Sequence, residues 1–141
     1  MKSWLIIMLL AAPWAPAQNS SQDCVPAYEN HNQIDYGPLI FDHLSGRAVD
    51  PSSLQMPRVC LGLFKEGNHK LVATASTDEN GNFKFSVVPL GRYRLVVHAD
   101  GLCAANVPLR IVRAKNSSKS RELVLHMRPS GIDACSYGDY K

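Results

Sequence analysis

The sequence feature that most constrains the fold is a regular alternation of apolar and polar residues, interrupted by two turn signals. The alternating apolar positions are Phe83, Phe85 and Val87, and then Tyr93, Leu95, Val97 and Ala99. A period of two is typical of β-strands that bury one face and expose the other. Asn80-Gly81 tolerates the positive φ of a tight hairpin turn, and Asp78 can accept hydrogen bonds from its downstream backbone. Pro89 with Gly91 marks a second corner, so the stretch predicts a β-meander.

The rest of the chain also consists of short apolar runs separated by turn residues. These runs occupy 39–50, 56–64, 71–77, 104–112 and 122–127. About seven short strands at steady spacing favour an all-β fold, an antiparallel β-sandwich. We expect one domain at 39–128, because a chain of this length buries a single core. The flanks 18–38 and 129–141 are polar and turn-rich, and they are predicted to be irregular, cysteine-bearing arms.

The first 17 residues have the pattern of a signal peptide. Lys2 provides a positive start, an apolar run covers 4–12, and Ala15-Pro16-Ala17 fits the small-x-small cleavage pattern. The apolar run is shorter than the roughly 20 residues that a membrane span needs. We therefore expect cleavage before Gln18 and a secreted or periplasmic mature chain with no membrane span.

The charged residues are nearly balanced. The chain has 15 Lys and Arg against 12 Asp and Glu, and signal cleavage removes Lys2. Because the basic residues are scattered rather than gathered in one run, we expect no nucleic-acid partner. The densest local group is interpreted as a solvated surface, and it comprises Arg110, Arg113, Lys115, Lys119 and Arg121.

The four cysteines, Cys24, Cys60, Cys103 and Cys135, all follow the predicted signal. An even number of cysteines in an exported chain indicates disulfides. Four cysteines allow three pairings, and the sequence does not choose between them. We favour Cys24 with Cys135, tying the two arms, and Cys60 with Cys103, tying two core strands or a strand to a neighbouring loop. Chain entropy gives each bridge about 4 kcal/mol.

Motifs for metal binding are weak throughout the chain. No C-x-x-C or close Cys/His pair supports zinc, and no H-E-x-x-H pattern supports a zinc peptidase. The segment 78–82 faintly resembles a calcium loop, but an EF-hand needs a twelve-residue frame that ends in Glu, and Lys84 and Phe85 interrupt it. We expect a hairpin turn there, and no metal or cofactor.

The order of turn and core residues resembles the carboxypeptidase regulatory-like domain over about 44–127. The motifs are Gly46-x-x-Val49-Asp50, Val59-x-Leu61-x-Leu63, Ala75-x-Thr77-Asp78, Gly81-x-Phe83-x-Phe85, Pro89-x-Gly91-x-Tyr93-x-Leu95-x-Val97 and Ala99-x-Gly101. The resemblance implies a transthyretin-like, Greek-key β-sandwich. It also implies an accessory module, which accompanies the catalytic unit in metallocarboxypeptidases and occurs in cell-surface proteins.

Two alternative kinds of site stay open. Some transthyretin-like proteins hydrolyse a urate-derived ring, and their terminal Tyr-Arg-Gly-Ser segment does not match residues 136–141 here. A cryptic hydrolase would require His98, His126 and a carboxylate to converge within hydrogen-bond reach, although both histidines are predicted to face solvent. A carbohydrate- or small-ligand-binding domain would instead expose tyrosines on a concave patch, namely Tyr28, Tyr36, Tyr137 or Tyr140.

The well-formed motifs serve turns, strand faces and disulfides, and none assembles a reactive constellation. The sequence therefore predicts an exported, non-catalytic β-sandwich module with a structural or protein-binding role at the cell envelope or outside the cell. Its partner is an unidentified protein or glycan. Asn19 and Asn116 each begin an Asn-Ser-Ser acceptor pattern for N-glycosylation.

Overall fold

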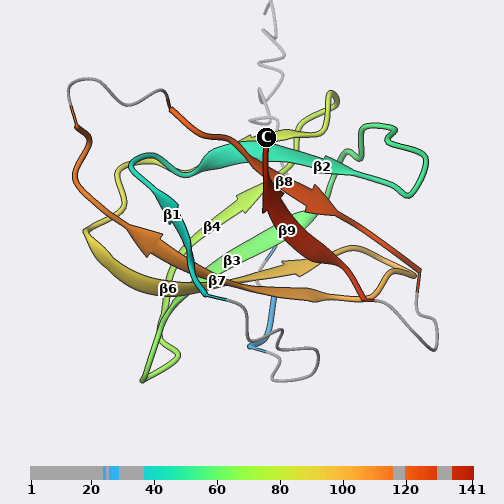
Figure 1. Ribbon diagram of the computed structural model, residues 1–141. Helices are drawn as coiled ribbons and strands as arrows, with labels where there is room; N and C mark the ends of the chain where they lie inside the picture. The colour runs from blue at the N-terminus through green and yellow to red at the C-terminus, as the bar shows by residue number, and fades with distance from the viewer. Residues whose placement is uncertain (1–23, 25, 29–36, 116–119, 130–134) are drawn as a thin grey trace, which may run out of the picture.

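A computed structural model of the chain describes residues 24, 26–28, 37–115, 120–129 and 135–141. The described part is all-β (Figure 1). Its strands are β1 Leu39–Phe41, β2 Ser45–Val49, β3 Cys60–Lys65, β4 Leu71–Ser76, β5 Asn82–Lys84, β6 Gly91–His98, β7 Ala105–Ile111, β8 Leu123–His126 and β9 Tyr137–Tyr140. The predicted signal peptide, both predicted glycosylation sites and most of the arm 18–38 lie outside the described residues. Among the described residues, no helix is long and apolar enough to cross a membrane.

The strands form two sheets that face each other across one core. The five-stranded sheet has the order β1-β7-β6-β3-β4, and the four-stranded sheet has the order β5-β2-β8-β9. Inward side chains of both sheets, such as Leu95 and Leu123, belong to the same buried cluster. The predicted all-β sandwich is thus confirmed, with nine strands in the described residues rather than about seven.

The prediction of a purely antiparallel sandwich is wrong, because each sheet contains one parallel pair. β1 pairs in parallel with β7, and β2 pairs in parallel with β8. The run 39–50, expected as one segment, divides at 42–44 and passes there from the five-stranded to the four-stranded sheet. The chain makes the same change of sheet between β7 and β8. The consecutive strands β1 and β2 thus lie in different sheets, and so do β7 and β8. β1 lies beside β7 in the five-stranded sheet, and β2 lies beside β8 in the four-stranded sheet.

The predicted β-meander is also wrong, although its turn chemistry is right. Gly81 has φ 76°, and the Asp78 Oδ1 atom accepts hydrogen bonds from the backbone N–H groups of Asn80 and Asn82, each at 2.9 Å. However, β4 and β5 belong to different sheets, so the turn leads from one sheet to the other. A contact with β2 holds it there, since the Ala48 N–H donates to the Gly81 carbonyl at 2.9 Å.

Two further predictions fail where strands end or begin. Val87 was predicted to point inward with Phe83 and Phe85, but its side chain is 100% exposed. β5 ends at Lys84, and beyond it the chain crosses the end of the sandwich instead of continuing the alternation. The predicted irregular tail 129–141 contains β9, which pairs with β8 and completes the four-stranded sheet.

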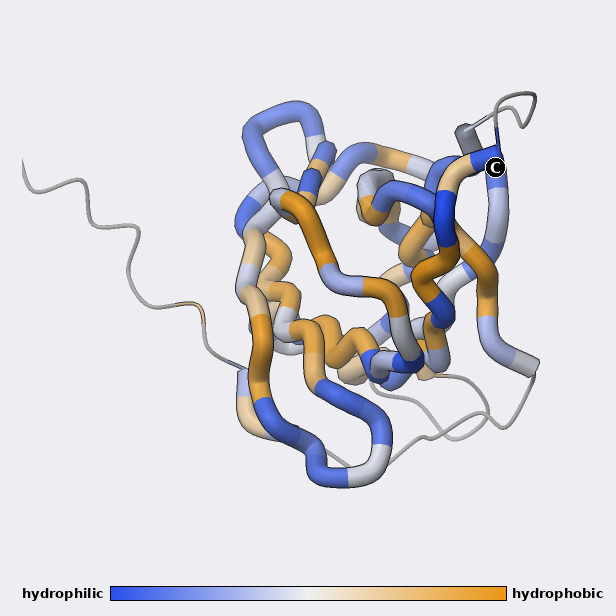
Figure 2. The backbone as a smooth tube through the Cα atoms, turned by 90° about the vertical axis from the view of Figure 1, so that its left-hand side faces the viewer, coloured by the Kyte–Doolittle hydropathy of each residue, from blue (hydrophilic) through white to orange (hydrophobic). Residues whose placement is uncertain are grey.

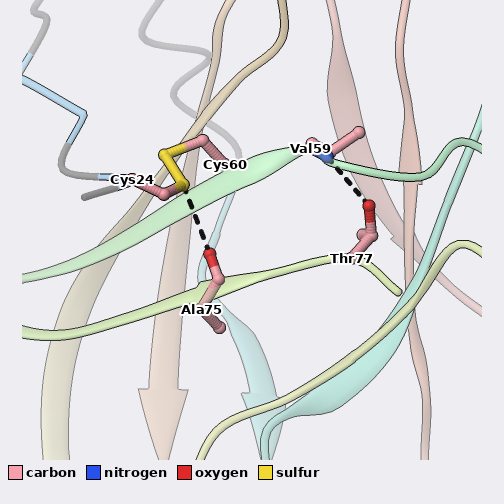
Figure 3. The surroundings of a disulfide bond; sticks show 5 residues. All are labelled: Cys24, Val59, Cys60, Ala75 and Thr77. Atoms are coloured by element: carbon pink, nitrogen blue, oxygen red, sulfur yellow. Dashed lines mark hydrogen bonds between the residues drawn. A yellow bond between two sulfur atoms is a disulfide. The ribbon is translucent and has the colours of Figure 1, made fainter. Parts of the chain in front are cut away.

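The disulfides join Cys24 to Cys60 and Cys103 to Cys135, which corrects the predicted pairing. Cys60 points to the outer face of the five-stranded sheet, since its neighbour Leu61 is wholly buried in the core. Residues 24 and 26–28 lie along that outer face, and the Cys24 sulfur is 3.7 Å from the Ala75 carbonyl oxygen (Figure 3). Cys103 instead lies beside the β8–β9 connection, where its N–H donates to the Arg128 carbonyl at 2.8 Å.

Candidate functional site

The candidate site is a basic pocket at the end of the sandwich where β1 and β7 terminate and β8 begins. Its volume is about 320 Å³. The pocket is lined by Ile40, Phe41, Asp42, Val112, Arg113, Lys115 and Arg121. We call it the basic pocket. It brings together side chains that are about 80 residues apart in the sequence.

The parallel pairing of β1 with β7 brings residues 40–42 next to residues 112–115, and both segments contribute to the lining of the basic pocket. Phe41 is opposite Ile111 in the register, and the Val112 N–H donates to the Phe41 carbonyl at 2.9 Å. Ladder bonding ends at that point, so Arg113 and Lys115 follow immediately beyond the last paired residue. Both side chains are exposed at the pocket wall.

Tyr140 of β9 contacts three of the residues that line the basic pocket, namely Ile40, Phe41 and Arg121. Its hydroxyl oxygen accepts a hydrogen bond from the Ile40 N–H at 2.6 Å, and its ring centroid lies 5.4 Å from that of Phe41. The Arg121 guanidinium carbon lies 4.9 Å from the same ring centroid, in the geometry of a cation–π contact. Arg121 is therefore oriented by a ring that is itself packed against the core.

The electrostatic character of the basic pocket is positive. Arg113, Lys115 and Arg121 face one carboxylate, Asp42, and Asp42 Oδ1 already accepts a hydrogen bond from the His43 N–H at 2.8 Å. The floor contains apolar side chains, among them the buried Phe41. Guanidinium and ammonium groups donate strong, charge-assisted hydrogen bonds to carboxylate and phosphate oxygens. The pocket is thus equipped to hold an anion with an apolar portion.

Sequence reasoning found these basic residues but not the pocket. Arg113, Lys115 and Arg121 belong to the densest basic group of the sequence, which was interpreted as a solvated surface. The side chains are indeed exposed, yet they line a hollow whose other wall comes from 40–42. The density of cations in the sequence could have indicated an anion-binding site. The parallel β1–β7 pairing that completes the pocket could not be predicted from it.

The two histidines named for a cryptic hydrolase do not come together. His98 follows the inward Val97 on β6, and His126 follows the inward Leu125 on β8. Each therefore points outward from its own sheet, and the two outer faces look in opposite directions across the core. His126 stacks on Tyr137 instead, with ring centroids 4.7 Å apart.

The tyrosines named for a ligand-binding patch are also separated. Tyr28 stacks on His69 against the outer face of the five-stranded sheet, at 3.8 Å between ring centroids. Tyr137 lies on the outer face of the four-stranded sheet beside Arg128, and Tyr140 borders the basic pocket. Tyr36 lies outside the described residues. The described tyrosines therefore form no common patch.

The remaining candidate sites have structural roles. At the suspected calcium loop, the Asp78 carboxylate accepts backbone hydrogen bonds, as the predicted turn requires. Within the described residues, no group of three His, Cys, Asp or Glu side chains is arranged to hold a metal ion. A second hollow of about 430 Å³ at the opposite end is lined by Pro57, Arg58, Thr77, Asp78 and Glu79.

Comparisons with known proteins give no family. No protein-family model matches the chain, and no curated protein sequence matches it. Among solved structures, it is similar to an (S)-allantoin synthase, with a TM-score of 0.45 and 12% identity over 74% of this chain and 44% of that one. It is also similar to the 3-chlorocatechol 1,2-dioxygenase of Rhodococcus opacus 1CP, with a TM-score of 0.39 and 12% identity over 78% of this chain and 63% of that one. This chain thus spans less than two thirds of either protein. Because no family model matches, the resemblance to the carboxypeptidase regulatory-like domain stays a prediction from sequence motifs.

Proposed function

We propose that this protein is an exported, non-catalytic β-sandwich module that binds an acidic partner at the basic pocket. The observation that carries the proposal is the gathering of Arg113, Lys115 and Arg121 around an apolar floor, with Asp42 as the one acid among the described lining residues. The partner class is an acidic protein segment or, as the alternative, an acidic glycan or small ligand. Export is supported by two disulfides, which persist in oxidising compartments.

The non-catalytic part of the proposal is supported by where the potential acid–base groups lie. His98 and His126 point away from each other, and neither lines the basic pocket. General acid–base partners must act within direct or one-water reach of each other and the substrate. The pocket offers guanidinium and ammonium donors, which suit recognition of a fixed anion.

The experiment is a binding assay with soluble acidic probes on the oxidised, exported chain. A Glu-rich peptide, inorganic phosphate and a glycan array with acidic and neutral members are the probes, and R113Q/R121Q is the test variant. R58Q is the matched control, since Arg58 is an exposed cation at the opposite end. We expect the wild type and R58Q to retain acidic probes and R113Q/R121Q to lose at least tenfold in affinity. Equal affinity in all three proteins, or binding of neutral glycans alone, contradicts the proposal.

A further inference from the structure

The loop between β5 and β6 exposes apolar side chains at the same end as the basic pocket. Val87 is 100% exposed and Leu90 is 58% exposed. Gly91 is opposite Ile111 in the antiparallel pairing of β6 with β7, so the loop lies next to the segment that carries Arg113. Figure 2 shows the sandwich from the side on which the β5–β6 loop lies in Figure 1.

This loop is held in place rather than free to fold its apolar side chains inward. The Phe85 N–H donates to the Leu44 carbonyl at 3.0 Å, and the Phe85 side chain is buried. At the other end of the loop, the Tyr93 hydroxyl donates to the Pro89 carbonyl at 2.7 Å. Both anchors fix the backbone with Val87 and Leu90 directed away from the core. The loop therefore presents Val87 and Leu90 to solvent as an apolar tip.

Cations outnumber acids at this end of the molecule, among the described residues. The cations at this end include Lys84, Arg92, Arg110, Arg113, Lys115 and Arg121. In the described part of the chain, the acids at this end are Asp42, Glu66, Glu122 and Asp139, the last opposite Val124 near the start of β8. Glu66 and Glu122 pair with cations of the same end. Glu66 Oε1 lies 3.8 Å from Arg94 Nη2, and Glu122 Oε2 lies 3.8 Å from Lys141 Nζ. Asp50, Asp78, Glu79 and Asp100 lie at the opposite end.

Two of these cations are placed in mutual repulsion. Arg92 of β6 is directly opposite Arg110 of β7, and both side chains are exposed on the outer face. Like charges directly opposite each other destabilise a sheet. An anionic surface lying against this end would attract both guanidinium groups and so offset their mutual repulsion.

We propose that this end of the molecule docks on the surface of an anionic phospholipid bilayer, with Val87 and Leu90 inserted among the lipids and the surrounding cations on the headgroup phosphates. The inference rests on the proposed function, because the basic pocket would receive one headgroup. Apolar side chains within a basic rim match the two layers of a bilayer surface.

The test is vesicle co-sedimentation of the oxidised, exported chain with phosphatidylcholine vesicles and with vesicles that contain phosphatidylglycerol. We expect binding to the anionic vesicles only, weakened by salt. Two variants outside the basic pocket separate the contributions. V87S/L90S should weaken vesicle binding at least tenfold, and R92Q should weaken it about fivefold, as removal of one interfacial charge predicts.

The matched control is L54S, because Leu54 is 64% exposed in the β2–β3 connection at the opposite end. L54S should bind anionic vesicles like the wild type. If V87S/L90S binds anionic vesicles like the wild type, the bilayer proposal is overturned. If vesicles fail while soluble phosphate still binds through Arg113 and Arg121, the bilayer proposal is overturned and the proposed function stands. If neither the anionic vesicles nor the soluble acidic probes bind, the bilayer proposal and the proposed function are both overturned.

Discussion

Pro26 lies directly against Gly62, in the space that a side chain on β3 would otherwise occupy. A Cβ atom added to Gly62 would come within 2.6 Å of Pro26 Cγ. The contact is one of three in matching register, because Cys24 is bonded to Cys60 and the ring of Tyr28 lies 5.3 Å from that of Phe64. Residues 24, 26 and 28 therefore lie against residues 60, 62 and 64 of β3, along the outer face of the five-stranded sheet.

We predict that G62A destabilises the protein by about 1–3 kcal/mol, because the added methyl group displaces the buried Pro26 ring. The measurement is the free energy of unfolding in urea. In G62A/P26A the loss should be smaller than the sum of the two single losses, as expected for residues in contact. G37A is the control, since nothing lies within 4 Å of a Cβ atom at Gly37. Additive losses would mean that Pro26 and Gly62 do not interact.

Peptide mapping without reduction should recover Cys24 linked to Cys60 and Cys103 linked to Cys135, with no free thiol. Recovery of Cys24 linked to Cys135 would contradict this structure. The variant C103A/C135A should lose up to about 4 kcal/mol of stability, because it opens a loop of 32 residues in the unfolded chain. Thermal unfolding of the oxidised proteins measures this loss.

Thr77 links two segments through one buried hydroxyl, so T77V should destabilise the protein by about 1–3 kcal/mol. The Thr77 Oγ1 atom accepts a hydrogen bond from the Val59 N–H at 2.8 Å and donates one to the Met56 carbonyl at 2.7 Å. Valine has nearly the same shape but leaves the buried Val59 N–H without this acceptor. T77S keeps the hydroxyl and should lose clearly less in chemical denaturation. Equal losses in T77V and T77S would assign the effect to packing.

Stability should fall at alkaline pH in part because of Tyr93. Burial raises the pKa of the Tyr93 phenol above its ordinary value of 10.0. The unfolded chain therefore releases this proton at lower pH than the folded chain does. The contribution to the free energy of unfolding is complete below about pH 10 and is lost as the pH rises through the folded-state pKa.

Y93F tests this assignment. The variant also lacks the hydrogen bond to the Pro89 carbonyl, so its stability at neutral pH should be lower by about 0.5–1.5 kcal/mol. The difference between wild type and Y93F should then shrink above pH 10, as followed by denaturation at a series of pH values. A constant difference from pH 7 to pH 11 would show that Tyr93 does not contribute to the alkaline loss.

Features that depend on neighbours within a few residues were predictable from the sequence. Phe83, Phe85 and Leu95 are buried as their alternation indicates, because a strand directs successive side chains to opposite faces whatever it pairs with. The turn at 78–82 forms as predicted, since its hydrogen bonds join atoms of the same five residues. The all-β class follows from many such local signals together.

Tertiary structure alone decided which strands are neighbours, and with them the disulfides and the basic pocket. The same turn residues at Asn80-Gly81 serve a hairpin or a crossing between sheets, and the pairing of β5 with β2, together with the Ala48–Gly81 hydrogen bond, belongs to the crossing. Likewise, the position of Arg121 beside Phe41 depends on β9 placing Tyr140 between them. The alternation along a strand states which face is buried and carries no information on the partner strand, because backbone hydrogen-bonding groups are the same in every strand.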